Sequence, residues 1–351
     1  MTLTSTIQLV CPAPLDAPDG VQLGHGSGGK MSAALLRDRF LPALGNHVLA
    51  ELGDGALIGV GRSEIVVSTD TFVVSPLEFP GGNIGSLAVH GSVNDVAMMG
   101  ARPVYLTAGF ILEEGLSLAL LDRVLRSMAD AATVAGVPVV AGDTKVVERG
   151  KADGLYINTT CIGEAHPQFR PNPARARIGD AVIVSGAIGR HGMAIMAARE
   201  GLALETTITS DSASLAGLVD DLRAAHLDVH VMRDPTRGGV ASALNEIAAA
   251  SRVGVEIHEE ILPVPDDVRA ACEVLGLDPL YVANEGILIA FVSETDADRA
   301  LRVMHHHPLG AGAVEIGRVV ARHPGTVALR TSLGGTRIVD LLPGDQLPRI
   351  C

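Results

Sequence analysis

Four aspartates in the first half of the chain lie where a carboxylate is costly: Asp54 in ELGDGALI, Asp70 in the apolar stretch around STDT, Asp95 in NDVAMMG and Asp143 in AGDTKV. A carboxylate within an apolar element must be paired or metal-bound to offset its desolvation. Carboxylate oxygens suit Mg²⁺, which usually works together with substrate phosphates. Each aspartate alone could equally be a turn, cap or surface residue, but four in one domain favour a magnesium–nucleotide site.

A glycine-rich segment, GHGSGGK, runs from Gly24 to Lys30. Glycines allow backbone N–H groups to turn toward an anion, and Lys30 adds a positive charge. The segment lacks the spacing of a Walker A loop, and no strand clearly precedes it. Phosphate binding and a merely flexible glycine loop both stay open on this segment alone.

Lys145 follows Asp143 by two positions, so the two side chains share one face of a predicted strand. A lysine there could stabilise charge on a transferred phosphate, and a surface ion pair is the alternative. Glu285 in NEG precedes an apolar strand, where it could act as a base or be a turn residue.

The segment MRDPTRGG precedes a predicted helix and offers Arg233 and Arg237 to a phosphate or carboxylate. Ordinary capping by Asp234 and Thr236 explains the same segment without any ligand.

The sequence ends in PRIC, on Cys351. Pro343 and Pro348 predict an extended, mobile approach to this cysteine. Prenylation would need three residues after the cysteine, which excludes that lipid site. A chance cysteine and a carrier thiol on a moving arm both stay open.

Composition narrows the class of protein. A chain of 351 residues is longer than one hydrophobic core usually holds, which predicts two domains. The net charge of -13 argues against binding to nucleic acid or to an anionic membrane. No apolar run reaches bilayer length, no basic residue precedes Lys30 as in a signal peptide, and no CxxC pair occurs. We expect a cytoplasmic protein without a zinc site or disulfide framework.

Periodicity predicts alternating strands and helices, that is, an α/β (α+β) fold. The proline-rich stretch 166–180 marks a domain boundary. The predicted strands are 65–75, 104–113, 137–147, 155–165, 181–186, 253–258, 286–292 and 313–319, and the predicted helices are 81–100, 117–135, 191–200, 212–225 and 238–251. The predicted divisions are an N-terminal segment 1–45, domains 46–166 and 167–332, and a flexible tail 333–351. The histidine run 305–307 is interpreted as a surface loop.

GHGSGGK, STDT, NDVAMMGARP, AGDTKV, RDPTRGG, NEG and PRIC follow one another along nearly the whole chain. Together they resemble the HypE family of nickel–iron hydrogenase maturation factors, which are carbamoyl dehydratases of the PurM-like (AIR synthase-related) superfamily. NDVAMMGA and GDTK indicate only the superfamily, whereas the final PRIC is the discriminating motif. The resemblance implies two PurM-like domains, with N-terminal domains that pair in a homodimer around a β-barrel-like core.

The resemblance also implies a reaction. A carbamoyltransferase, HypF, would place a carbamoyl group on Cys351. The chain would then use ATP and Mg²⁺ to dehydrate this thiocarboxamide to a thiocyanate, and the cyano group would pass to iron on a HypC–HypD complex.

The residues that match the family motifs are assigned by resemblance. Metal ligands would be Asp54, Asp70, Asp95 and Asp143, and these would also contact the nucleotide. Further nucleotide contacts would be His25, Gly26, Gly28, Gly29, Lys30, Thr71, Asn94, Thr144 and Arg233, and the catalytic residues would be Cys351, Lys145 and Glu285.

Two alternatives stay open. The first is another ATP-dependent enzyme of the superfamily: an AIR synthetase, a thiamine-phosphate kinase, or a selenide water dikinase, for which Cys11 is the one candidate reactive thiol near the N-terminus. The second is a non-enzymatic carrier or scaffold that docks through Cys351. The other superfamily enzymes need no terminal cysteine, and ATP hydrolysis that depends on carbamoylated Cys351 would distinguish the dehydratase from the carrier.

Overall fold

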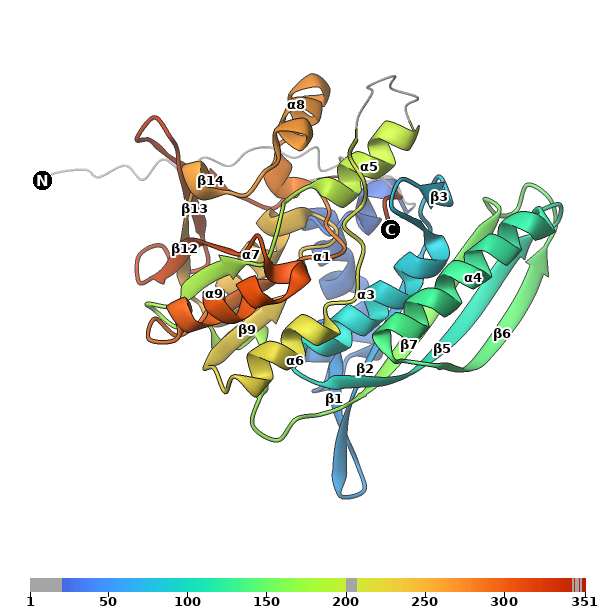
Figure 1. Cartoon of the computed structure of the whole chain (residues 1–351), viewed down its shortest axis with the longest axis horizontal. Coiled ribbons are helices and arrows are strands. Elements are labelled where there is room, and N and C mark those ends of the chain that lie inside the picture. The colour runs from blue at the N-terminus through green and yellow to red at the C-terminus, as the bar shows by residue number, and fades with distance from the viewer. Residues whose placement is uncertain (1–20, 200–206, 343, 345–346, 348) are drawn as a thin grey trace, which may run out of the picture.

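The computed structural model describes residues 21–199, 207–342, 344, 347 and 349–351. The N-terminal half and the C-terminal half each form a sheet covered by helices, and the C-terminus lies between them, beside α5 and β3 (Figure 1). The predictions for Cys11, Pro343 and Pro348 fall outside the described residues. Within the described residues, no helix is long and apolar enough to cross a membrane.

The N-terminal half contains a five-stranded sheet in the order β1-β2-β7-β5-β6, which is antiparallel except for the parallel pair β5–β6. A two-stranded ribbon, β3–β4, precedes helix α3. The strands are β1 Ala56–Val60, β2 Ser63–Phe72, β3 Glu78–Phe79, β4 Gly82–Asn83, β5 Arg102–Glu113, β6 Val139–Val147 and β7 Leu155–Glu164. The helices are α1 Lys30–Leu35, α2 Leu41–Leu44, α3 Ile84–Met98 and α4 Leu118–Ala135.

Helix α3 has glycines on two of its faces, and these bring it close to its neighbours. A Cβ on Gly85 would lie 2.3 Å from the backbone oxygen of Val124 on α4, and a Cβ on Gly91 would lie 2.8 Å from the ring of Phe72 on β2. Asn83 caps the helix by accepting hydrogen bonds from two backbone N–H groups of its first turn. The close packing fixes the height of α3 above β2, the two elements that carry Asp95 and Asp70.

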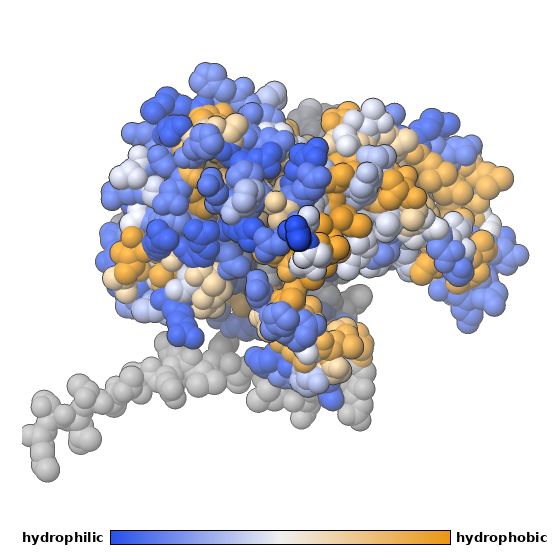
Figure 2. Space-filling view, turned by 90° about the horizontal axis from the view of Figure 1, so that it is seen from below, coloured by the Kyte–Doolittle hydropathy of each residue, from blue (hydrophilic) through white to orange (hydrophobic). Residues whose placement is uncertain are grey.

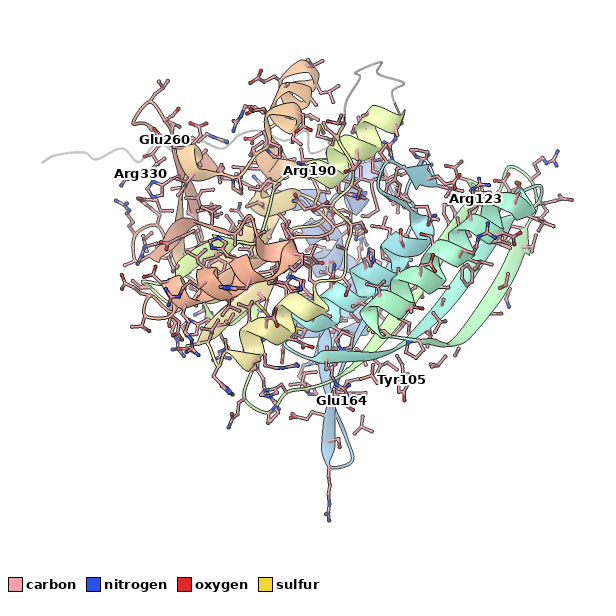
Figure 3. All side chains as sticks on the ribbon, viewed as in Figure 1. Tyr105, Arg123, Glu164, Arg190, Glu260 and Arg330 are labelled. Atoms are coloured by element: carbon pink, nitrogen blue, oxygen red, sulfur yellow. The ribbon has the colours of Figure 1, made fainter. Side chains whose placement is uncertain are left out.

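Among the described residues, no helix covers the opposite face of this sheet. Tyr105 and Ile111 on β5 are 47% and 44% exposed on this face. A broad apolar area is seen from below the molecule (Figure 2). Tyr105 and Glu164 project from this uncovered side, whereas Arg123 marks the outer helix α4 on the covered side (Figure 3). Large uncovered apolar faces on soluble proteins mark interaction surfaces.

The C-terminal half contains a seven-stranded mixed sheet in the order β14-β13-β10-β12-β8-β11-β9. Helix α7 packs on one face, and α6 and α9 pack on the other. The strands are β8 Ala181–Val184, β9 Val229–Arg233, β10 Gly254–His258, β11 Ile289–Val292, β12 Val314–Val320, β13 Val327–Arg330 and β14 Thr336–Val339. The helices are α5 Arg190–Arg199, α6 Ala216–Ala224, α7 Gly239–Ser251, α8 Asp266–Leu275 and α9 Ala297–His306.

Three sequence predictions are wrong in this structure. The N-terminal segment 1–45, in which no helix was predicted, contains α1 and α2. The predicted tail 333–351 contains β14, which pairs with β13 in the C-terminal sheet. The histidine run is not a loop, because His305 and His306 end helix α9, where His305 bonds to the carbonyl oxygen of Ala313. Helices α1 and α2 and strand β14 are short, which leaves little periodic signal, whereas α9 has buried residues at helical spacing that the loop interpretation overlooked.

Candidate active site

A cavity of about 230 Å³ lies between the two halves of the molecule and collects acidic side chains from five separate segments. These residues are Asp54 before β1, Asp70 on β2, Asp95 on α3, Asp234 after β9 and Glu285 before β11. The cavity is thus built from both halves, and three of the four predicted aspartates meet in it.

The carboxylates are close enough to bind one cation together. One oxygen each of Asp54, Asp95 and Asp234 lies within 4.8 Å of the others. The hydroxyl of Ser68 donates a hydrogen bond to Asp95 Oδ2 at 2.5 Å. Three hard oxygen donors without a nitrogen or sulfur ligand match the preference of Mg²⁺. The donor set therefore fits the predicted metal, although one of its members, Asp234, was not among the predicted ligands.

Burial sets the protonation of this cluster. Desolvation raises the pKa of Asp54 and Asp95 well above the usual range, and neighbouring carboxylates raise both further. Desolvation also raises the pKa of Asp70, and it raises that of Asp234 to about 6. In the absence of a bound cation, the cavity favours protonated acids over several adjacent negative charges.

Two arginines offset part of this charge. Arg233, a predicted nucleotide contact, binds Asp54 Oδ1 through Nε at 2.7 Å and Glu246 through Nη2 at 2.7 Å. Arg237 lines the same cavity, and the negative charge of Cys351 followed by that of Asp70 raises its pKa. Phosphates entering the cavity would meet these guanidinium groups as well as a metal ion.

Glu285 is buried at one wall of the cavity. Burial, together with the charge of Asp234, raises its pKa well above the usual range, and among the described residues its Oε1 has no hydrogen-bond partner. The Asp211 carboxylate accepts the backbone N–H groups of Glu285 and Gly286. A Cβ on Gly286 would lie 1.7 Å from the carbonyl oxygen of Asp211, so only glycine fits after this glutamate.

Asn94, predicted to contact the nucleotide, makes other contacts. Its Nδ2 donates to the carbonyl oxygens of Ala213 and Glu285, and its Oδ1 accepts the N–H of Leu215. The side chain therefore holds the backbone behind the cavity, whereas Thr71 lies in the cavity wall.

The end of the chain is docked in the cavity. Cys351 lines it together with the carboxylates, and Leu347 and Ile350 are buried. The N–H groups of Val73 and Ser75 donate to a terminal carboxylate oxygen of Cys351 and to the carbonyl oxygen of Arg349, both at 3.1 Å. The prediction of a mobile tail does not describe these last residues, because backbone hydrogen bonds and apolar burial hold them in place.

The glycine segment lies beside the cavity and against the approach to the tail. Arg237 Nη1 donates to Gly26 O at 3.2 Å, and a Cβ on Gly28 would lie 2.9 Å from Arg237 O. The N–H of Lys30 donates to Leu342 O, and its ammonium group is 2.5 Å from Asp340. Gly29 packs on the same Leu342 carbonyl, while His25 Nδ1 accepts the N–H of Gln22. None of these predicted nucleotide contacts lines the acidic cavity in this arrangement.

Asp143, Thr144 and Lys145 lie elsewhere. They are exposed on edge strand β6, where Lys145 Nζ is 2.7 Å from Asp143 Oδ2. The hydrogen bond from Lys145 lowers the pKa of Asp143. Within one chain, this group therefore forms the surface ion pair that the sequence left as its alternative.

Sequence reasoning missed Asp234, Ser68 and Asp211. Asp234 and Arg237 stand in RDPTRGG, a segment whose two arginines were noted but whose aspartate was interpreted as a cap. Ser68 stands two positions before Asp70 on the same strand face, which strand periodicity could have indicated. Asp211 carries no local signal, because its partners lie more than seventy residues away.

Family models match both halves of the chain. The model described as AIR synthase related protein, N-terminal domain, matches residues 52–165, and the corresponding C-terminal domain model matches residues 177–330. The chain is 54% identical over 339 residues to a Rhizobium leguminosarum bv. viciae protein named carbamoyl dehydratase HypE, covering 96% of this chain and 97% of the relative. It is 50% identical over 351 residues to the Cupriavidus necator protein of the same name, covering 99% and 100%.

Solved structures agree with these relatives. A HypE–HypF complex superposes with a TM-score of 0.84 at 46% identity, covering 88% of this chain and 100% of that chain. A hydrogenase maturation protein HypE in complex with ATP superposes with a TM-score of 0.80 at 49% identity, covering 94% and 99%. A thiamine monophosphate kinase from Aquifex aeolicus, at 19% identity over 89% of this chain and 99% of that chain, has a TM-score of 0.64 and shares the fold alone.

Proposed function

The chain belongs to the HypE carbamoyl dehydratases of the AIR synthase related family, and from this premise we propose that it converts a carbamoyl group on Cys351 into a thiocyanate at the expense of ATP. As a HypE protein it is an ATP-binding enzyme of hydrogenase maturation. The thiocyanate would supply the cyanide ligand of the hydrogenase iron.

The observation that carries this proposal is the position of Cys351. The last residue of the sequence lines the same cavity as the acidic cluster and Glu285. A carrier thiol needs to reach the groups that act on its cargo, and this arrangement brings a tethered thiol to them at high effective concentration. A chance terminal cysteine would have no reason to occupy the cavity.

Asp54, Asp95 and Asp234 would hold the magnesium ion, with Asp70 beside them. A bound Mg²⁺ would neutralise phosphate charge and hold the nucleotide for in-line attack. Arg233 and Arg237 add positive charge to the same wall. The glycine segment from His25 to Lys30 would close over the phosphates through backbone N–H groups, with Arg237 as its present link to the cavity.

The reaction balances as follows. The carbamoyl oxygen attacks the γ-phosphorus, ADP leaves with the electrons of the broken P–O bond, and the nitrogen loses one proton. The carbon–oxygen bond then breaks, releasing phosphate, while the nitrogen loses its second proton to give the C≡N bond. Glu285 in its ionised form would accept a nitrogen proton, and the position of its buried Oε1 at the cavity wall, without another partner among the described residues, supports this role.

Lys145 and Asp143 would enter the site from a second copy of the chain. Both lie on the uncovered sheet face, since Asp143 pairs with Gly109, and Lys145 with the exposed Ile111. Thr71, which lines the cavity, lies on that same face, but on β2, which is three strands away from β6. A two-fold dimer through this face would place each β6 near the partner's β2. The uncovered apolar area supports such a homodimer.

The docked tail also implies a cycle with two partners. In the docked position Cys351 is only partly exposed, and its backbone accepts a hydrogen bond from Val73, the residue directly after β2. A HypF carbamoyltransferase would load the thiol when the tail is outside, and a HypC–HypD complex would receive the cyano group after the tail leaves again.

The test is the intact mass of the protein after incubation with HypF, carbamoyl phosphate and ATP, beside Cys351→Ala. The expected result is the gain of one carbamoyl group followed by ATP-dependent loss of one water, with neither change in the variant. A folded, ATP-binding protein that stays unmodified by a demonstrably active HypF would remove the carrier role. Carbamoylation without dehydration would leave a carrier that is not the dehydratase.

A further inference from the structure

The last three residues lie in a groove in which each backbone carbonyl or carboxylate group has its own donor. The carbonyl of Arg349 accepts from the N–H of Ser75 and from Arg199 Nη2 at 2.8 Å. A terminal carboxylate oxygen of Cys351 accepts from the N–H of Val73. These hydrogen bonds are made to backbone atoms of the tail and not to its side chains. They therefore determine how far the tail enters the cavity.

The carbonyl between these two is held by a buried histidine. His191 Nε2 lies 2.6 Å from Ile350 O, and the imidazole has no exposed surface. A carbonyl oxygen can only accept, so Nε2 must carry the proton. Burial lowers the pKa of His191 to about 4, and the ring is therefore neutral at neutral pH. Its other nitrogen, Nδ1, must then be an acceptor.

That acceptor has a matching donor. Ser210 Oγ lies 2.8 Å from His191 Nδ1, and Ser210 Oγ itself accepts the N–H of Ser212. The hydroxyl proton is thereby directed to the histidine, which fixes the tautomer that faces the tail. Phe79 packs edge-on to the imidazole, with ring centroids 5.5 Å apart and an interplanar angle of 90°. Both ring nitrogens are therefore hydrogen-bonded and the ring contacts Phe79, which restricts its rotation and its tautomer.

We propose that His191 is a positioning residue that sets the register of the docked tail through Ile350, and so places the Cys351 sulfur in front of Glu285. The proposal rests on the carrier role of Cys351 proposed above. The loop that contains Ser210 and Asp211 contacts both the tail-binding histidine and the proposed base. Ser210 orients His191, and Asp211 accepts the backbone N–H groups of Glu285 and Gly286. Correct docking and correct placement of the base thus depend on neighbouring residues.

A matched control exists on the other side of this loop. His90 on α3 is partly buried, its pKa is also lowered by burial to about 4, and its Nδ1 lies 2.9 Å from Ser212 Oγ. Among the described residues, no hydrogen bond joins His90 to the tail. Substituting either histidine removes one imidazole–serine bond from the loop, but only His191 also bonds to Ile350.

The first measurement is the rate at which iodoacetamide modifies Cys351 in the full chain, read by peptide mass so that other cysteines do not count. His191→Leu should raise this rate roughly three- to ten-fold, the ratio that loss of one net hydrogen bond supports for the docking equilibrium. His90→Leu should leave it within about two-fold, and His191→Gln, which keeps a donor near the Nε2 position, should restore slow labelling. Equal rates in His191→Leu and wild type, or equal increases in both leucine variants, would overturn the proposal.

The second measurement separates docking from loading. His191→Leu should slow dehydration of carbamoylated Cys351 while HypF loads the thiol at the wild-type rate or faster, because loading needs the tail outside. Parallel loss of both steps would indicate a merely structural role. If His191→Leu does not fold, Ser210→Ala carries the same comparison, since it removes the donor that fixes the tautomer. Wild-type protein that is never carbamoylated would refute the function but leave the labelling result valid.

Discussion

Lys145 offers the sharpest test of the proposed active site, because the structure places it out of reach of the cavity in its own chain. Thr71, Asn158, Gly109 and Asp143 are directly paired across β2, β7, β5 and β6. Three strand spacings separate Thr71 in the cavity wall from Asp143, or about 14 Å. Lys145 lies two residues further along β6, and a lysine side chain extends only roughly 6 Å from its Cα.

The perturbation is a mixed dimer of a Lys145→Ala chain and a Glu285→Ala chain, isolated with two different tags. In a two-fold dimer that shares Lys145 across the interface, one of the two sites would contain an intact Glu285 and an intact Lys145. We expect both homodimers to be inactive and the mixed dimer to retain about half of the wild-type dehydration rate per dimer.

The assay is the intact mass of each chain after loading by HypF and addition of ATP. The two tags give the two chains different masses, so the product can be assigned to one chain. The thiocyanate should appear on the Lys145→Ala chain, whose own Glu285 is intact, and not on its partner. An inactive mixed dimer would refute sharing across the interface, and a fully active Lys145→Ala homodimer would refute any role for this lysine.

Three further outcomes follow from the same geometry. Asp95→Asn should weaken binding of magnesium with a non-hydrolysable ATP analogue by roughly 10- to 100-fold in calorimetry, and unchanged affinity would remove Asp95 from the metal site. Glu285→Gln should still be carbamoylated but should dehydrate its cargo roughly 10²- to 10⁴-fold more slowly by intact mass, so a normal rate would exclude it as the base. Burial raises the pKa of Asp211 from 3.8 to about 6, so its contribution to the free energy of unfolding is present below about pH 4 and is lost as pH rises through about 6. Chemical denaturation of Asp211→Asn should therefore lack about 3 kcal/mol of that decrease, and identical pH slopes in the variant and the wild type would contradict the shift.

Much of the fold could be predicted because the longer elements carry strong periodic signals. Strand β11 lies in a continuous apolar run, and the structure buries Ile289 and Phe291 in one cluster and Ala290 and Val292 in another, so both faces of the strand are covered. Helix α9 was missed although its buried residues Ala297, Ala300 and Met304 have helical spacing, because the histidines at its end were interpreted as a loop. Periodicity reports burial, and short or weakly buried elements leave little of it in the sequence.

The site was harder to predict because proximity depends on strand order. Asp70 and Asp143 look alike in the sequence, because each lies in a predicted strand directly after a Thr or a Gly. The strand order β2-β7-β5-β6 nevertheless separates them by three strand spacings within one sheet. Asp234 joined the cluster although capping explained it locally. A one-dimensional sequence can therefore indicate which carboxylates are costly, but only the sheet topology decides which of them share a cavity.

The acidic cavity lowers the stability of the ligand-free protein. Asp54, Asp95, Asp234 and Glu285 lose hydration on burial that the protein alone does not restore, and this loss raises their pKa values. Arg233 pairs with Asp54, but it also pairs with Glu246 and cannot neutralise the whole group. Well-packed apolar residues at these positions would stabilise the fold. A bound cation with phosphates would add favourable interactions to those of Arg233 and Ser68, because its charge would allow the carboxylates to ionise. The same desolvation that costs stability in the ligand-free protein therefore strengthens every charge interaction in the loaded site.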